Sequence, residues 1–220
     1  MNQSSPNYIP ALKFHSLTRF YDHVVRLTTR ERVFKKALIN QVTAKEDEKL
    51  LDVGCGTGTL IEMLAHQQPK LIITGLDADR NALNQAMVKV KSLDTYITLE
   101  HGYAQQIPLV SETFDIATSS LFFHHLTKEQ KQKTFNEIYR TLKPGGRLHI
   151  ADWGKPASRY QRILFYLIQI LDGFETTSDN VQGVLPNMIF KAGFLDIEET
   201  SCIATPLGTI RLLKAIKPME

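Results

Sequence analysis

Residues 50 to 60 of the chain read Leu50-Leu51-Asp52-Val53-Gly54-Cys55-Gly56-Thr57-Gly58-Thr59-Leu60. The apolar residues at the start of this segment predict a short strand, and the apolar pattern that continues to Ala65 predicts a helix. Three alternate glycines between them let the backbone turn sharply and let a ligand lie against main-chain atoms. A helix that begins there directs free N–H groups and the positive end of its dipole toward that ligand. The segment therefore predicts a site for a nucleotide-like ligand at the first strand-to-helix turn of an α/β sheet.

Three kinds of ligand fit a glycine-rich turn, and the spacing separates them. A triphosphate loop needs a Lys and then Ser or Thr after its last glycine, but Thr59 and Leu60 follow Gly58. A dinucleotide loop has the spacing Gly-x-Gly-x-x-Gly, whereas the third glycine here comes one residue early. Asp52 also stands two positions before the first glycine. This acid-x-Gly-x-Gly-x-Gly pattern resembles motif I of the class I methyltransferases that use S-adenosylmethionine (SAM), and an NAD-type oxidoreductase is the alternative.

Length and composition set the class of protein. The 220 residues are enough for one domain, and 43% apolar with 22% charged residues is ordinary for a soluble globular protein. A net charge of +3 with scattered Lys and Arg does not indicate nucleic acid binding. The start of the chain has no signal-peptide pattern, and the apolar stretch 163–171 is too short to span a bilayer, so no stable membrane insertion is expected. Cys55 and Cys202 form no disulfide framework or metal-ligand spacing, which favours a cytoplasmic location.

The rest of the chain alternates strands with helices before the pattern changes near its end. Strands are predicted at 71–76, 96–99, 114–118 and 147–151, with Asp79 and Thr127 as caps of the intervening helices. A short helix at 187–192 is followed by a strand at 195–205 and a returning strand at 209–216. Such a closing hairpin resembles the sixth and seventh strands of the SAM methyltransferase sheet. The predicted fold is a seven-stranded, mostly parallel, Rossmann-like α/β sheet with helices on both faces and a C-terminal antiparallel hairpin.

A single SAM methyltransferase domain, 1–220, is expected, and four parts are distinguished along it. Residues 1–44 form an N-terminal helical cap, in which Thr28 begins a capping box. Residues 45–152 form the SAM-binding core, 153–186 a substrate lid insertion, and 187–220 the closing helix and hairpin.

The cofactor-binding residues follow partly from position and partly from the resemblance. Asp77 ends the second predicted strand, where a carboxylate accepts both ribose hydroxyls of SAM or NAD. The resemblance places Ala78 at the adenine face, but Tyr103 replaces the Asp of the family's Gly-Asp-Ala motif. The adenine would then be bound by the Ala104 backbone, by the side-chain amide of Gln105 or Gln106, or by stacking on Tyr103. The predicted set is Asp52, Gly54, Cys55, Gly56, Thr57, Gly58, Asp77, Ala78, Ala104, Gln105 and Ser119, with Arg30 as a candidate partner of the SAM carboxylate.

The span 21–218 resembles the small-molecule methyltransferases typified by the ubiquinone and menaquinone biosynthesis enzymes. The segments that carry this resemblance are 50–59, 107–115, 120–126, 142–146 and 151–153. The Asp/Asn-Pro-Pro-aromatic motif of nucleic acid amino-methylation is replaced by Ser119-Ser120-Leu121-Phe122, and no nucleophilic Cys lies near the fourth strand. Only Asp152 stands where catechol-type enzymes hold a metal, so no metal is expected.

Methyl transfer from a sulfonium is an in-line displacement in which alignment alone lowers much of the barrier. His124 and His125, just past the fourth strand, and Asp152 at the end of the fifth are the candidate catalytic residues, although packing or capping would also explain the histidines. Apolar and aromatic residues in 153–186 and 12–25 favour a small, partly hydrophobic acceptor, with S-adenosylhomocysteine as the second product. We expect a monomer or homodimer. A non-catalytic SAM-binding or regulatory protein, and a lipid methyltransferase at a membrane surface, are the alternatives.

Overall fold

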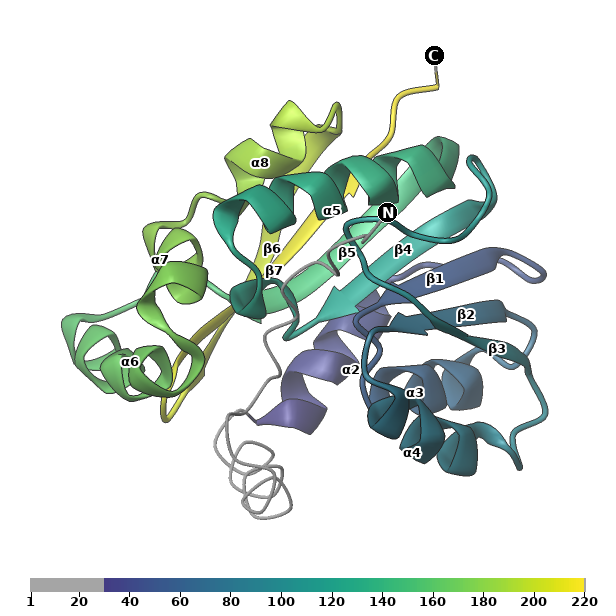
Figure 1. Ribbon diagram of the computed structural model, residues 1–220, viewed down its shortest axis with the longest axis horizontal. Helices are drawn as coiled ribbons and strands as arrows, with labels where there is room; N and C mark the ends of the chain where they lie inside the picture. The colour runs from purple at the N-terminus through teal and green to yellow at the C-terminus, as the bar shows by residue number, and fades with distance from the viewer. Residues whose placement is uncertain (1–29, 220) are drawn as a thin grey trace, which may run out of the picture.

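The computed structural model describes residues 30–219, which fold around one seven-stranded sheet in the order β3-β2-β1-β4-β5-β7-β6 (Figure 1). The strands are β1 (Lys49–Val53), β2 (Ile72–Asp77), β3 (Tyr96–His101), β4 (Phe114–Ser120), β5 (Leu142–Trp153), β6 (Leu195–Thr205) and β7 (Gly208–Ile216). The helices are α2 (Glu31–Gln41), α3 (Thr59–Gln67), α4 (Arg80–Val90), the 3₁₀ turn η1 (Phe123–His125), α5 (Lys128–Thr141), α6 (Arg159–Asp172), α7 (Phe174–Gln182) and α8 (Leu185–Lys191). The predicted fold class is confirmed.

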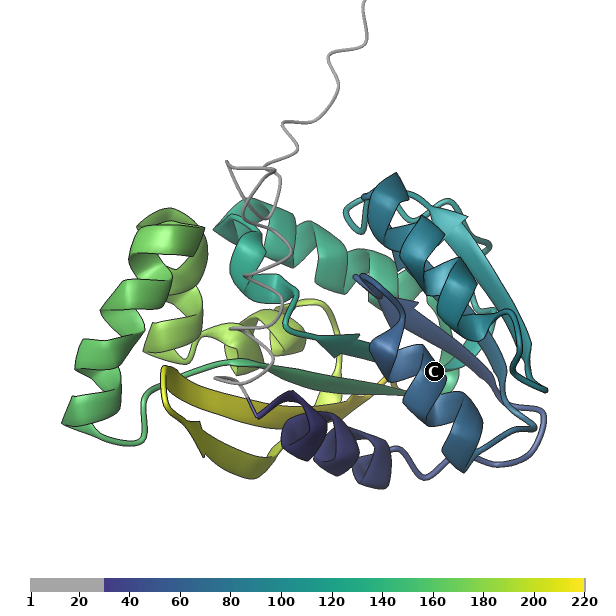
Figure 2. The ribbon, with the colours of Figure 1, turned by 90° about the horizontal axis from the view of Figure 1, so that it is seen from below.

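Strand direction follows from the connections. Strands β1 to β5 pair in parallel because a crossover segment separates each from its neighbour, whereas β7 runs antiparallel to both β5 and β6. Helices α2, α3 and α4 cover one face of the sheet, and α5 and α8 cover the other (Figures 1 and 2). Helices α6 and α7 lie beyond the end of the sheet at which β4 and β5 finish (Figure 1).

Each face of the sheet buries its own hydrophobic core, which explains the near-continuous apolar character of the central strands. The core under α2 and α3 includes Phe34, Leu38, Leu60, Ile61, Leu64 and Ile73. The core under α5 and α8 includes Phe123, Phe135, Ile138, Met188, Ile189 and Phe194. These two layers hold the strand ends, and therefore the loops that follow them, in fixed relative positions.

Local sequence signals predicted two helix starts correctly, whereas the start of β5 was predicted too late. The Asp79 side chain accepts from the amides at the start of α4, and Thr127 forms the predicted capping box with Gln130. The cap expected at Thr28 lies outside the described residues, and α2 begins at Glu31. The segment 144–146 was expected to precede the fifth strand, but β5 already begins at Leu142. Its pairing with β4 shifts register there, so this Pro-Gly-Gly segment is an irregular part of the strand.

Candidate active site

The glycine loop, residues 54–58, joins β1 to α3. Gly54, Gly56 and Gly58 have φ values of 71°, 53° and 75°, in the left-handed region that favours glycine. A Cβ built on Gly54 would lie 2.2 Å from the Phe122 ring, whereas one on Gly56 would meet no atom within 4 Å. The loop is therefore packed against the segment after β4 and is open at Gly56, where a ligand can approach the backbone.

Asp77 lies beside this opening, at the carboxyl end of β2. One carboxylate oxygen accepts from the Gly56 amide at 2.7 Å, and the other accepts from the Asp79 amide at 2.8 Å. Burial raises the pKa of the Asp77 carboxyl, and the hydrogen bonds from backbone amides oppose that rise. The next carbonyl, at Ala78, lies 3.1 Å from the His101 ring nitrogen. The acid and the glycine loop thus form one unit.

Asp52 is buried under the glycine loop, with 1% of its surface exposed. One oxygen accepts from the Thr118 hydroxyl at 2.8 Å, while its second oxygen has no partner among residues 30–219. Burial raises the pKa of Asp52 to about 6, the Thr118 hydrogen bond and Lys35 oppose the rise, and Asp77 adds to it. An unpartnered buried carboxylate oxygen is costly, so this position suits a cationic or hydrogen-bond-donating ligand group.

Three other expected cofactor residues make structural contacts. The Ser119 hydroxyl donates to the Val53 carbonyl at 2.8 Å and ties β4 to β1. Cys55 is buried, and burial, with Asp52 and Asp77 adding to it, raises the pKa of its thiol, which keeps it neutral. The Thr57 hydroxyl accepts from the Lys89 ammonium at 3.0 Å. The backbone atoms of Cys55 and Thr57 remain part of the glycine loop, but all three side chains stabilise the fold.

The loop after β3 lies next to Asp77, because the Gly102 amide donates to the Asp77 carbonyl at 3.0 Å. Ala104 is buried and Gln105 is half-buried in this loop. Arg30 was a candidate partner for the cofactor carboxylate, but its guanidinium donates to the Ala204 carbonyl at the tip of the hairpin at 3.2 Å. The structure therefore groups Ala104 and Gln105 with the expected site and directs Arg30 elsewhere.

His124 and Asp152 meet where β4 and β5 end. The His124 Nδ1 lies 2.7 Å from an Asp152 oxygen, and that same oxygen accepts from the Trp153 amide. The second Asp152 oxygen accepts from the amides of Phe122 and Phe123 at 3.0 and 2.7 Å. Asp152 thus accepts four hydrogen bonds and is 2% exposed, so it fixes the η1 turn and the His124 ring. Because a carboxylate only accepts, the Nδ1 of His124 carries a proton.

His125 lies against His124, with ring centroids 3.9 Å apart. Burial lowers the pKa of His125 well below its usual value, and the adjacent His124 lowers it further. His125 is therefore neutral at neutral pH. The three candidate catalytic residues are brought together, with Asp152 in contact with His124.

The segment 153–186 forms α6 and α7, which break at Gly173. Its inner side is core: the Trp153 ring meets Phe165 edge-on at 5.4 Å, and Asn180 donates to the Trp153 carbonyl at 2.9 Å. The outer side carries large exposed apolar residues, with 69% of Tyr160 and 69% of Ile170 exposed. The exposed stripe on α6 comprises Tyr160, Ile163, Tyr166, Leu167 and Ile170.

Some residues of the site escaped the sequence analysis. Lys131 of α5 is fully buried and donates to the Thr176 carbonyl at 2.5 Å, with Asp179 at 3.4 Å, which fastens α7 over η1. Burial lowers the pKa of Lys131, and Asp179 opposes that change. A signal was present, because Lys131 falls on the apolar face of its helix, four residues before Phe135. Thr118, the partner of Asp52, follows a buried strand but carries no motif.

Comparison with known proteins identifies the family of the chain. Residues 50–146 match the family model of a methyltransferase domain. A methyltransferase of Synechocystis, sll0829, is 31% identical over 178 residues, which are 79% of this chain and 81% of that protein. The ubiquinone/menaquinone biosynthesis C-methyltransferase UbiE of Blochmanniella floridana is 28% identical, covering 87% of this chain and 84% of that protein. The structure of a Haemonchus contortus phosphoethanolamine N-methyltransferase, solved with S-adenosylhomocysteine, is 21% identical with a TM-score of 0.67, covering 84% of this chain and 52% of that one.

A glycine loop after β1, an acid after β2 and a β3-β2-β1-β4-β5-β7-β6 sheet define a class I, Rossmann-like methyltransferase. The chain belongs to the SAM-dependent methyltransferases and resembles UbiE. Its cofactor is SAM. The residues present fit that cofactor, because the open backbone at Gly56 and the unpartnered Asp52 oxygen suit its amino acid end.

None of the helices within residues 30–219 has the length and apolar character needed to cross a bilayer. In the same residues, no group of three His, Cys, Asp or Glu side chains converges as metal ligands do.

Proposed function

We propose that this methyltransferase acts on a small, partly hydrophobic acceptor by in-line displacement, with His124 as the group that takes up a proton. The observation that carries the proposal is the His124–Asp152 contact of 2.7 Å at the ends of β4 and β5. It lies next to the glycine loop, because Phe122, two residues before His124, packs on Gly54.

Each residue has a role derived from its contacts. SAM supplies an electrophilic methyl group when it is bound. Asp52 would hold the ammonium with its unpartnered oxygen, Asp77 would accept from the ribose hydroxyls, and the loop that contains Ala104 and Gln105 would contact the adenine. Asp152 is a positioning residue, because it keeps the Nδ1 proton of His124 in place, and a proton from the acceptor would go to Nε2.

The proposal of an apolar acceptor is supported by the aromatic side chains around the His124 ring. Trp153 and Phe165 are buried core residues next to His124, and the Trp153 ring lies edge-on to His124 with centroids 6.5 Å apart. Segment 153–186 is the proposed substrate lid of a single domain, since α7 packs on η1 and is bonded to α5 through Lys131. Apolar walls with few polar groups are typical of small-molecule sites.

An acceptor panel tests this function. Purified protein is incubated with methyl-labelled SAM and with quinols, phenols, amines and lipids, and labelled product is measured beside S-adenosylhomocysteine. We expect turnover with apolar quinols or phenols. Turnover only with polar amino acids or RNA contradicts the apolar acceptor, and SAM binding by calorimetry without any methyl consumption favours the non-catalytic alternative.

A lipid acceptor at a membrane surface is the second candidate, and the exposed stripe on α6 favours it. Ile163, Leu167 and Ile170 recur at helical spacing and are 64%, 53% and 69% exposed. Liposome co-sedimentation of Ile163→Glu should show weaker membrane association than wild type, whereas Val88→Glu, at another exposed apolar position, should not. Equal sedimentation of all three excludes the stripe as a membrane contact.

Location and assembly are also proposals. A cytoplasmic protein is supported by the free thiols of Cys55 and Cys202. The absence of nucleic acid partners is supported by the net charge of +3 with no basic cluster in the sequence, and a monomer or homodimer is the proposed assembly. Size-exclusion chromatography with light scattering decides the assembly.

A further inference from the structure

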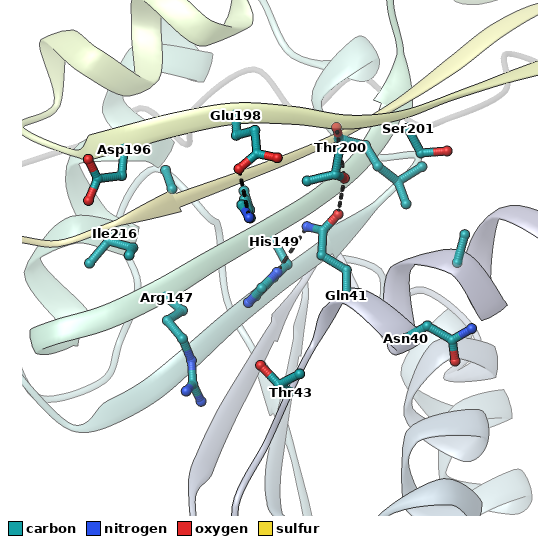
Figure 3. A pocket seen from close by; sticks show the side chains of 14 residues that line it. Asn40, Gln41, Thr43, Arg147, His149, Asp196, Glu198, Thr200, Ser201 and Ile216 are labelled. Carbon is teal, nitrogen blue, oxygen red and sulfur yellow. Dashed lines mark hydrogen bonds and ion pairs between the residues drawn. The ribbon is translucent and has the colours of Figure 1, made fainter.

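A cavity of about 660 Å³ lies between α2 and the β5-β7-β6 side of the sheet (Figure 3). We name it the hairpin groove. Arg147 and His149 of β5 line it, together with Gln41 of α2, Lys214 of β7 and Glu198 of β6. It is distinct from the methyl transfer site, because Asp152 lies five residues beyond Arg147, roughly 16 Å along an extended strand.

Gln41 determines where the proton of His149 lies. The Gln41 side-chain nitrogen is 3.0 Å from the Leu213 carbonyl, which only accepts, so this atom is the NH₂ group. The same nitrogen lies 2.9 Å from His149 Nδ1, which therefore accepts (Figure 3). The Thr200 hydroxyl donates to the Gln41 oxygen and fixes the amide from its other side.

The His149 ring is neutral at neutral pH. Burial, and then the nearby charges of Arg147 and Lys214, lower the pKa of His149 to about 4. A neutral imidazole whose Nδ1 accepts carries its proton on Nε2. The groove is therefore lined by a His149 N–H donor whose orientation is set by its neighbour.

Two buried donors in this groove lack acceptors. His149 is 4% exposed, and its Nε2 has no partner within the described part of the chain. The Arg147 Nε is likewise buried without a partner, although another nitrogen of the same guanidinium bonds Glu48 at 2.7 Å. The two residues are two apart on one strand, so they share a face with their Cα atoms roughly 6.6 Å apart. Unsatisfied buried donors are rare in folded proteins, so together they indicate an acceptor oxygen as ligand.

The other charges in and around the groove define what else this ligand carries. Lys214 pairs with Glu198 at 2.7 Å, and Arg147 pairs with Glu48, so both cations already have a carboxylate. Asp196 adds a third carboxylate to the lining. Three acids against two cations disfavour a polyanion and favour a ligand that also bears a positive group.

We propose that the hairpin groove binds a small zwitterionic amino acid. Its carboxylate accepts from His149 Nε2–H and Arg147 Nε–H, and its ammonium lies toward Glu198 and Asp196. A bidentate, charge-assisted arrangement of this kind is a strong form of hydrogen bonding. No bond is made or broken, and the site is independent of the methyl transfer residues.

Calorimetric titration tests the proposal with glycine, 4-aminobutyrate and 6-aminohexanoate as probes, beside butyrate, butylamine and inorganic phosphate. We expect saturable binding of at least one amino carboxylate, tighter than butyrate, butylamine or phosphate. Arg147→Lys keeps the charge but removes the Nε–H, and His149→Phe removes the Nε2–H. Each should weaken binding about tenfold, as expected for one charge-assisted bond, and the controls Arg32→Lys and His66→Phe should not.

Three results overturn the proposal: no amino carboxylate binds, phosphate or butyrate binds as tightly, or both groove variants bind like wild type. SAM titration of each variant shows that it is folded, and Arg147→Lys decides the question if His149→Phe does not fold. In wild type, long-range ¹H–¹⁵N correlation of the His149 ring should show the Nε2–H tautomer, with the Nε2 resonance moving on binding. An Nδ1–H tautomer also contradicts the proposal.

Discussion

Replacing Asp52 by Asn removes a buried negative charge that destabilises the folded protein. Burial raises the pKa of Asp52 from 3.8 to about 6. A pKa raised in the folded state means that the folded protein binds the proton more tightly than the unfolded chain does. Protonation of Asp52 therefore adds to the free energy of unfolding. This contribution is fully present below pH 3.8 and is lost as the pH rises through about 6. The shift corresponds to about 3 kcal/mol of unfolding free energy at neutral pH.

Asp52→Asn should therefore stabilise the ligand-free protein at pH 7 by up to about 3 kcal/mol, with a gain that disappears near pH 4. Urea unfolding of both proteins between pH 4 and pH 8 measures the gain. SAM affinity, measured by calorimetry at pH 7, should fall, because the amide cannot neutralise the ammonium of the ligand. A more stable protein that binds its cofactor less well is the expected trade-off.

Asp115→Asn is the matched control for this experiment, because the hydrogen bond from Lys143 lowers the pKa of Asp115 although its partial burial opposes that change. Removing that carboxylate should destabilise the protein at neutral pH and leave SAM affinity unchanged. The reasoning on Asp52 is refuted if its stability difference from wild type is the same at pH 4 and pH 7. Unchanged SAM affinity of Asp52→Asn refutes the proposed contact with the ammonium.

Three other predictions concern the same end of the sheet. Asp77→Ala should weaken SAM binding in calorimetry, since it removes the ribose acceptor and releases the Gly56 amide; unchanged affinity removes Asp77 from the site. Asp152→Asn should lower kcat strongly and change the KM for SAM less, because His124 loses its charged partner. It should also shift the pH profile of kcat, and an unaltered profile argues against the positioning role. Gly54→Ala should lower the melting temperature more than Gly56→Ala, because both strain a positive φ but only the first places a Cβ 2.2 Å from an aromatic ring; equal losses contradict the packing argument.

The sequence predicted those structural features that depend only on residues close together along the chain. The glycine loop, the Asp79 cap and the Thr127 capping box are local patterns, and the structure contains all three. The start of β5 was predicted too late, because Leu142 already pairs with β4, and Gly145 and Gly146 are held by backbone hydrogen bonds with Lys217 despite Pro144. Tertiary pairing overrides the local preference there.

Contacts between segments that are distant along the chain could not be predicted from the sequence. Nothing in the chain shows that Asp152 accepts the amides of a turn 29 and 30 residues earlier. The Gln41–His149 contact joins residues 108 positions apart, and the tautomer of His149 depends on it. Asp52 was recognised by its spacing from the glycines, but its second oxygen is revealed as unpartnered only by the packed structure.

The place of β7 in the sheet has a consequence for folding kinetics. β7 lies between β5 and β6, although it follows both in the chain. Until β7 docks, the outer edge of β5 has no partner and β6 has nothing to pair with, so the parallel half of the sheet presents an open edge. The pairing of residues 147–153 with 210–216 closes a long loop and is expected to form late. Aggregation during refolding should therefore begin at β5, and variants that weaken β7 should increase it before they reduce cofactor binding.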